Sequence, residues 1–233
     1  MLGVFHMLFG ARKALASLFF HASLFSYASV VFQTCGALPA MAEPVALVEG
    51  LSDLRFEVNG QSFTIARNPD PKAVIEGEFA RTSRACPPFC IQPMQAAPGL
   101  PTLGEVELLA FLRDKVATGE GVLLDARLPE WFAKGSIPSA VNVPFATLAP
   151  ENPFRYDILQ ALGARPAGGG KLDFAAVPEL VVFCNGAWSD QSLRALAALI
   201  EAGYPVEKLR YYRGGMQDWV MLGLTVAMTE RQE

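Results

Sequence analysis

The sequence predicts an α/β fold: a parallel β-sheet with helices on both faces, preceded by a small β-rich N-terminal segment. Residues 180–183 form a continuous apolar run, Leu-Val-Val-Phe, which is typical of a strand buried on both faces of a parallel sheet. Apolar residues then recur at helical spacing between residues 193 and 200. Strand and helix patterns alternate through the rest of the C-terminal half, and this alternation indicates a parallel sheet.

The first 42 residues have the pattern of an export signal or a membrane anchor. Arg12 and Lys13 precede a mostly apolar stretch over residues 14–38, and Ala40-Met41-Ala42 follows it. This order is typical of a secretory signal peptide cleaved after Ala42. About 25 apolar or small residues could also span a bilayer, so a retained membrane tether through 14–38 is the alternative. We therefore expect the folded part to be periplasmic or otherwise exported, and membrane-anchored if the leader is not cleaved.

Residues 43–100 are expected to form an N-terminal extension that begins with a β-hairpin. Asn59-Gly60 separates two alternating runs at 54–58 and 61–67, which is the strongest short-range hairpin signal. Residues 73–76 could add a third short strand.

A proline-rich stretch near the end of the extension contains Cys86 and Cys90 in the order Cys-Pro-Pro-Phe-Cys. In an oxidising compartment, this pair predicts a short disulfide across an irregular loop. The alternative is a redox-active pair that exchanges electrons or sulfur with Cys184. Two thiolates without a histidine fall short of the usual four ligands, so no metal site is expected.

Residues 101–233 are expected to form the α/β domain, after a linker at 96–101. The first expected element is a helix from Thr102, with a capping box to Glu105 and a buried stripe of Val106, Leu109, Ala110 and Leu112. A strand at 122–127, a second strand within 135–144, a helix over 152–164 and a surface turn at 168–170 follow it. After the strand at 180–183 we expect a helix that is capped by Ser189 or Asp190 and buries Leu193, Leu196, Ala197 and Ile200; the last elements are a strand at 209–212 and a helix over 216–222 that stops at Gly223.

Cys184 lies where the apolar strand ends and a short loop leads into a helix. In open α/β sheets, ligands bind outside the carboxyl ends of the strands. The N–H groups and positive dipole of a helix N-terminus favour an anion, so a cysteine held there is biased toward thiolate. This position predicts a nucleophilic Cys184, and the alternative is an inert buried cysteine.

Composition excludes several other classes of site and partner. The chain has two histidines, His6 and His21, and both lie in the leader. The folded part is therefore expected to lack Cys–His dyads, Ser–His–Asp triads and His-rich metal sites. A formal net charge of −4 argues against a nucleic-acid partner, and no cofactor is expected.

Four sequence blocks between residue 101 and about residue 229 resemble the rhodanese-like family of sulfurtransferases. They are Leu124-Asp125-Ala126-Arg127; Glu130 with Gly135-x-Ile137-Pro138-x-Ala140-x-Asn142-x-Pro144; the Phe183-Cys184 loop; and Tyr212-x-Gly214-Gly215-x-x-x-Trp219-x-x-Gly223-Leu224. The resemblance implies a sheet with helices on both faces and a Cys184 that accepts a sulfane sulfur. Family members have a histidine where this chain has Ser136, and a glycine is usual at Ser139.

The resemblance also implies the mechanism and the binding residues. Thiolate Cys184 attacks a sulfane sulfur and becomes a persulfide, and an acceptor thiol then removes that sulfur. Backbone N–H groups of the loop are expected to stabilise the charge. The partners are thus a small sulfane-sulfur donor and a thiol acceptor, which could be a protein. The expected substrate-binding residues are Asn185, Gly186, Ala187, Trp188, Ser189 and Arg127, although Asp125 and Arg127 mainly tie loops together in the family.

Two features of the loop bear on substrate and on rival functions. Residues 185–190 carry no Arg or Lys to attract thiosulfate, so thiosulfate is disfavoured as the donor. Asp190 stands six residues after Cys184, where a cysteine phosphatase needs an arginine to clamp phosphate, so a phosphatase is also disfavoured. The alternatives that stay open are a non-catalytic binding module and a periplasmic thiol-redox relay through Cys86, Cys90 and Cys184.

Overall fold

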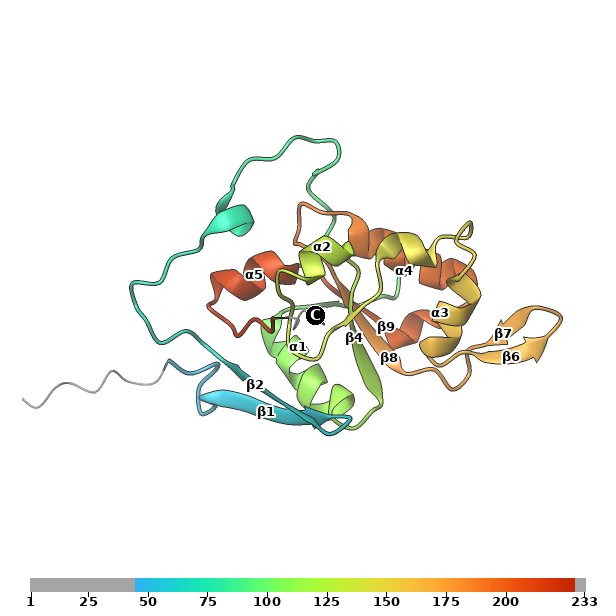
Figure 1. The fold of residues 1–233 in the computed structure, drawn as a ribbon, viewed down its shortest axis with the longest axis horizontal. Helices are drawn as coiled ribbons and strands as arrows, with labels where there is room; N and C mark the ends of the chain where they lie inside the picture. Colours follow the sequence, from blue (N-terminus) through green and yellow to red (C-terminus); the bar gives the residue numbers. More distant parts are fainter. Residues whose placement is uncertain (1–44, 229–233) are drawn as a thin grey trace, which may run out of the picture. The chain divides into compact units, whose positions relative to one another are not determined.

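A five-stranded sheet forms the centre of the computed structural model, which describes residues 45–228 (Figure 1). Its strands are β3 (Thr102–Leu103), β4 (Gly121–Asp125), β5 (Val141–Asn142), β8 (Glu179–Phe183) and β9 (Leu209–Tyr212). They lie in the order β3-β9-β8-β4-β5, and every neighbouring pair is parallel. The predicted parallel α/β sheet is confirmed.

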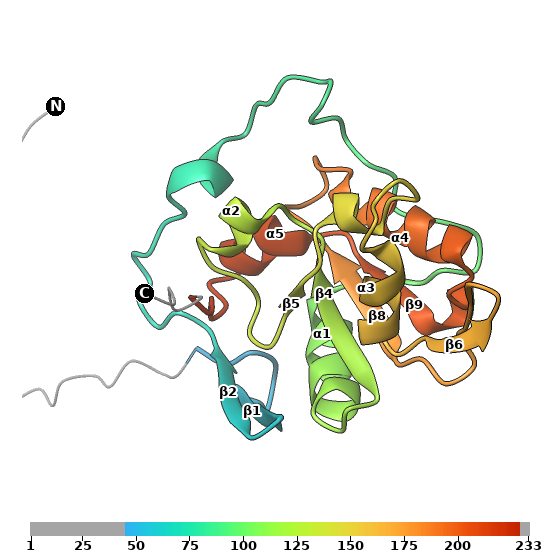
Figure 2. The same cartoon turned by 45° about the vertical axis from the view of Figure 1, so that its right-hand side comes forward.

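Helices cover both faces of this sheet (Figures 1 and 2). On one face lie α1 (Glu105–Phe111), its π-helical continuation η2 (Leu112–Val116) and α5 (Gly215–Met221). On the other face lie α3 (Arg155–Ala161) and α4 (Gln191–Ala202). Strand β8 shows why both faces are apolar: Leu180 and Val182 pack toward α3 and α4, whereas Val181 and Phe183 pack toward α1 and α5. Short helices α2 (Pro129–Phe132), η3 (Phe145–Leu148) and η4 (Val206–Lys208) lie in the connections.

The predicted N-terminal hairpin is confirmed and shares a core with the α/β domain. Strands β1 (Asp53–Val58) and β2 (Gln61–Ala66) are antiparallel, and Val58 pairs with Gln61 across the turn. Asn59 and Gly60 have φ values of 51° and 80°, as a two-residue turn of this kind requires. Leu54, Phe56 and Ile65 are buried in the same apolar cluster as α1 and α5. The hairpin is therefore stabilised by burial against the sheet's helices.

One predicted strand is absent, and one predicted turn lies in a hairpin that was not predicted. Residues 73–76 form no strand, and the 3-10 helix η1 (Gly77–Ala80) follows them. The surface turn predicted at 168–170 is confirmed, and it joins β6 (Arg165–Gly168) and β7 (Lys171–Asp173) in a small hairpin. The sequence pattern did not indicate these two strands because neither is apolar.

The start of α1 and the buried faces of α1 and α4 differ from the prediction, whereas α4 begins after Asp190, one of its two expected N-caps. Thr102 and Leu103 form β3, and α1 begins after Gly104, whose backbone N–H donates to the Glu107 carboxylate at 3.1 Å. Val106 is 57% exposed, while the buried residues of this helix and its continuation are Leu108, Leu109, Phe111, Leu112 and Val116. In α4 the buried residues are Ser192, Ala195, Leu196 and Leu199, so Ala197 faces solvent. Leu100, expected in a linker, is buried in the core.

The leader lies outside the described residues, and so do the predicted signal peptide, its cleavage site and the tether through 14–38. Between residues 45 and 228, no helix combines the length and the apolar character that crossing a membrane requires.

Candidate functional site

Cys184 directly follows β8, at the carboxyl edge of the sheet. Its carbonyl oxygen accepts a hydrogen bond from the Met216 backbone N–H at 3.0 Å, and the Asn185 carbonyl accepts one from Gln217 N–H at 2.9 Å. Gly215 permits this approach because its φ is 55° and a Cβ there would collide with the Cys184 carbonyl. The first turn of α5 thus fixes the backbone of the cysteine.

The sulfur of Cys184 is enclosed by the loop and by the first turn of α4. Cys184 is only 1% exposed. Its Sγ lies 3.0 Å from the Ser192 hydroxyl, and its S–H donates to the Ser189 carbonyl at 3.4 Å. Backbone N–H groups were expected around this sulfur, but its contacts in the structure are a hydroxyl and a carbonyl. A thiol suits the carbonyl, and a thiolate suits the hydroxyl.

The predicted loop residues lie together around the cysteine. Asn185, Gly186 and Ser189 are buried, whereas Ala187 and Trp188 are half-buried. Ser189 N–H donates to the Gly186 carbonyl at 3.0 Å and closes the turn. Gly186 has a φ of 148°, and a Cβ there would lie 2.8 Å from the Cβ of Gln217. Only a glycine fits this position without a shift of α5.

Residues 77–94 of the extension, here called the strap, lie across the outer side of this loop (Figures 1 and 2). Gln92 N–H donates to the Ala187 carbonyl at 2.8 Å, which joins the strap directly to the loop. Two side chains beyond the loop also hold the strap backbone. Arg213 donates to the Gln92 carbonyl at 2.9 Å, and Gln217 donates to the Phe79 carbonyl at 2.7 Å.

Trp188 is the part of the loop that the strap covers most closely. The Arg84 guanidinium lies 3.7 Å from the centre of the Trp188 ring, and the Phe89 ring contacts it edge-on with 5.5 Å between centroids. The indole N–H donates to the Gln217 side chain at 3.3 Å. Trp188 therefore binds the strap in this structure.

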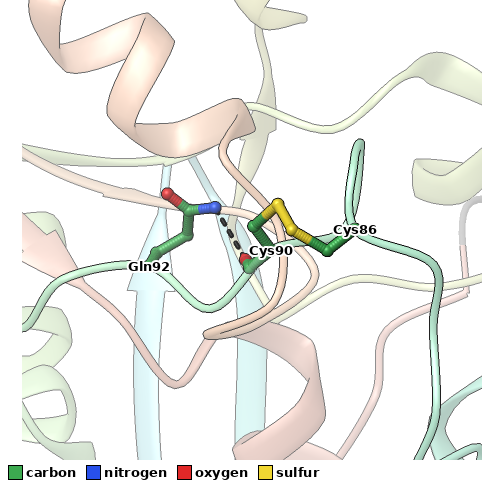
Figure 3. The surroundings of a disulfide bond; sticks show 3 residues. All are labelled: Cys86, Cys90 and Gln92. Carbon is green, nitrogen blue, oxygen red and sulfur yellow. Dashed lines mark hydrogen bonds between the residues drawn. A yellow bond between two sulfur atoms is a disulfide. The ribbon is translucent and has the colours of Figure 1, made fainter.

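The predicted Cys86–Cys90 disulfide is present and lies within the strap (Figure 3). It closes the short loop that carries Phe89, and the Gln92 side chain donates to the Cys90 carbonyl at 2.7 Å. Cys184 is the free cysteine of the part of the chain from 45 to 228. The disulfide thus fixes the piece of strap that contacts Trp188.

Arg127 lies beside the site in a buried bidentate ion pair with Asp125. Its Nε and Nη2 donate to the Asp125 carboxylate at distances between 2.6 and 3.0 Å, and Nη2 also donates to the Gly135 carbonyl. Ser136 donates its hydroxyl to the same carboxylate at 2.7 Å. Arg127 is 1% exposed, so these contacts fix loops, and substrate binding by Arg127 stays a prediction.

Ser136 and Ser139 depart from the family pattern with different consequences. The Ser136 hydroxyl donates a hydrogen bond to the Asp125 carboxylate. Ser139 has a φ of 67°, in the left-handed region that favours glycine, and this explains why a glycine is usual there.

The site contains residues that the sequence analysis did not single out: Arg84, Gln92, Ser192, Tyr211 and Gln217. The position of Ser192 near the cysteine could have been predicted, because this residue falls in the first turn of the helix that follows the cysteine loop. The positions of the other four could not, since they reach the loop from segments distant in sequence. Within residues 45–228, no group of acidic, cysteine or histidine side chains is arranged to hold a metal ion.

Comparison with known proteins identifies a family for the central part of the chain. Residues 108–222 match the model of the rhodanese-like domain. No curated protein matches the chain.

The solved structures to which the chain is similar include sulfurtransferases. A human single-domain sulfurtransferase is 28% identical, with 52% of this chain and 95% of that chain covered and a TM-score of 0.36. A thiosulfate sulfurtransferase from Pseudomonas aeruginosa is 23% identical, with 55% and 20% covered and a TM-score of 0.37. A protein of unknown function from Rhodopseudomonas palustris, described as a possible tyrosine phosphatase, is 20% identical, with 57% and 88% covered and a TM-score of 0.41.

Proposed function

Because residues 108–222 form a rhodanese-like domain, we propose that this protein transfers sulfane sulfur through a persulfide on Cys184. The observation that carries the proposal is the position of Cys184. It is a free cysteine at the carboxyl end of the central strand β8, and the loop after it leads into the twelve-residue helix α4. An open α/β sheet binds its ligand at this edge, so a nucleophile here can reach a bound substrate.

The proposed reaction needs two displacements at sulfur. The Cys184 thiolate attacks the outer sulfur of a donor R–S–S⁻, the donor S–S bond breaks, and RS⁻ leaves. The enzyme then holds Cys184–S–S⁻. An acceptor thiolate attacks the outer sulfur, takes it as R′–S–S⁻ and restores the Cys184 thiolate. Both steps exchange one S–S bond for another, so the cycle needs no external oxidant or reductant.

The charge of the loop favours a donor other than thiosulfate. Residues 185–190 contain no cation, and Asp190 adds a negative charge at the start of α4. Two nearby cations are already engaged: Arg213 donates to carbonyl groups of the strap, and Arg84 stacks on the Trp188 ring. We propose a persulfide or polysulfide donor, whose reaction depends less on an arginine clamp than that of thiosulfate does.

Burial of Cys184 supports a second candidate function. A sulfur that is 1% exposed and covered by a strap could belong to a domain that only binds a partner protein. If sulfur transfer does occur, the loop or the strap must move to admit the donor. The exported location remains part of the proposal and depends on the leader.

Intact-mass measurement after incubation with each of four donors tests the proposal: thiosulfate, polysulfide, glutathione persulfide and mercaptopyruvate. We expect polysulfide or glutathione persulfide to add the mass of one sulfur atom, and Cys184→Ser to abolish the gain. The double variant Cys86→Ser/Cys90→Ser is the matched control and should keep the gain. A gain retained by Cys184→Ser would indicate a relay through Cys86 and Cys90. No gain with any donor would favour the binding module.

A further inference from the structure

The side chain of Ser192 contacts the sulfur of Cys184 directly. Its hydroxyl oxygen is 3.0 Å from Cys184 Sγ, and Ser192 itself is fully buried. It belongs to the first turn of α4, where a hydrophobic stripe would place an apolar residue. A buried hydroxyl in contact with a thiol costs free energy unless the pair is hydrogen-bonded, so the geometry calls for a hydrogen bond between them.

Tyr211 approaches the same place from the neighbouring strand. It pairs with Val182 in the β8–β9 register, and both side chains pack toward α4. Cys184 is two residues beyond Val182, so its side chain points to that face as well. The Tyr211 hydroxyl is buried and lacks a hydrogen-bond partner within the described part of the chain.

The electrostatics of Tyr211 agree with this placement. Burial raises the pKa of Tyr211 to about 12; the nearby Cys184 acts in the same direction, and Ser192 and Arg213 act against it. Tyr211 is therefore a neutral donor at any physiological pH. Ser192 and Cys184 are close enough to the Tyr211 hydroxyl to affect its pKa, while the cation Arg213 donates to strap carbonyl groups.

We propose that Ser192 is a catalytic residue that donates a hydrogen bond to the Cys184 thiolate, and that Tyr211 is a positioning residue that donates to Ser192. This inference rests on the proposed sulfur transfer and deepens it. In the resting thiol, the S–H points to the Ser189 carbonyl. The Ser192 O–H donates to Sγ and keeps this hydrogen bond when the thiol loses its proton to solvent, and the Tyr211 O–H supplies the hydrogen bond that Ser192 accepts. The two hydroxyl groups take the place of the cationic loop residues that this chain lacks.

The test measures the pH at which Cys184 ionises. Ultraviolet absorbance of the thiolate monitors this ionisation. Each variant is compared with the same protein carrying Cys184→Ser, so that tyrosine absorbance cancels. This readout does not depend on access of a reagent to the buried sulfur. It also does not require sulfur transfer. Failure of the proposed function would appear as no persulfide mass with any donor, whereas failure of this inference would appear as an unchanged ionisation midpoint in the variants.

We expect Ser192→Ala to raise the midpoint of Cys184 ionisation by about one pH unit, because a hydrogen bond to a charged group is of that size. Tyr211→Phe should shift the midpoint in the same direction by a smaller amount. Two matched controls remove a buried hydroxyl elsewhere. Ser136→Ala loses its contact with Asp125, and Tyr204→Phe loses its contact with the Pro178 carbonyl at 2.6 Å. Neither control should move the midpoint.

The outcomes separate a role in ionisation from a role in packing. If Ser192→Ala and Tyr211→Phe lower thermal stability as the controls do but leave the midpoint unchanged, both residues are structural and the inference is wrong. If Ser192→Ala does not fold, Tyr211→Phe alone decides. In protein that forms a persulfide, Ser192→Ala should also shorten the lifetime of the persulfide.

Discussion

The ring of Phe89 contacts the ring of Trp188 edge-on, with 5.5 Å between the two centroids. Phe89 belongs to the strap, and Trp188 belongs to the loop that follows Cys184. The contact therefore joins the N-terminal extension to the loop around the candidate nucleophile. Arg84 stacks on the same indole, and Gln92 donates to the neighbouring Ala187 carbonyl. We expect an extension held in this way to restrict opening of the loop.

Removal of the aromatic contact should make Cys184 more accessible. We expect Phe89→Ala to raise the rate at which iodoacetamide alkylates Cys184 by up to about tenfold, since an aromatic pair contributes up to about 1.5 kcal/mol beyond its buried area. Peptide mapping by mass spectrometry measures the rate at this cysteine. Ile91→Ala is the matched control, because Ile91 lies on the same strap but is 86% exposed. Equal rates in the two variants would show that the strap does not limit access.

Loss of the disulfide should loosen the strap without removing the chemistry. The Cys86–Cys90 bond closes a loop with a sequence separation of 4, and closure of so short a loop stabilises a fold by about 2 kcal/mol. We expect Cys86→Ser/Cys90→Ser to lower the thermal midpoint, to accelerate alkylation of Cys184 and to retain sulfur transfer. Thermal unfolding followed by circular dichroism, with turnover measured in parallel, checks this. Unchanged stability with lost turnover would instead place the two cysteines in the reaction.

The sheet and its central cysteine could be predicted because their signals are local. An apolar run with a loop and a helix after it identifies β8, Cys184 and α4 without knowledge of any other segment. The face of α4 could not be predicted in the same way. Ser192 and Ala195 are buried because this helix packs closely on β8 and β9, and small residues on that face leave no hydrophobic signal.

The strap could not be predicted, because its contacts are neither periodic nor local. Gln92 is 95 residues from Ala187 in sequence, and the groups that hold the strap are mostly backbone carbonyls, which every residue has. Tyr211 was readable as a strand residue. Its proximity to Cys184 depends on the register between β8 and β9, which only the structure provides.

Breaking the buried Asp125–Arg127 pair by changing one partner should destabilise the fold strongly. Asp125→Asn keeps the shape of the side chain but leaves the Arg127 guanidinium buried beside a neutral amide, and loss of one partner of a buried pair costs about 3–5 kcal/mol. Urea unfolding measures the change in the free energy of unfolding. Asp114→Asn is the matched control, because Asp114 forms a similar pair with Arg113 at the surface and should leave stability unchanged within error. A similar loss in both variants would contradict a special role for the buried pair.

Asp218 should make stability depend on pH in the opposite direction from an ordinary paired carboxylate. Burial, and to a smaller extent Glu105, raise the pKa of the Asp218 carboxyl above its usual range, while Arg213 opposes them. A raised pKa means that the folded state holds this proton more tightly than the unfolded state. The contribution of Asp218 to stability is then fully present below the unfolded pKa of about 4 and is lost as the pH rises through the folded pKa.

Asp218→Asn isolates this contribution, because asparagine stays neutral at every pH. The variant should unfold at the same urea concentration as the natural protein at low pH, where both side chains are uncharged. It should be the more stable of the two at neutral pH, and the difference should grow as the pH rises from about 4. Urea unfolding at a series of pH values provides the measurement. A natural protein that gains stability over Asp218→Asn with rising pH would show that the attraction of Arg213 outweighs burial.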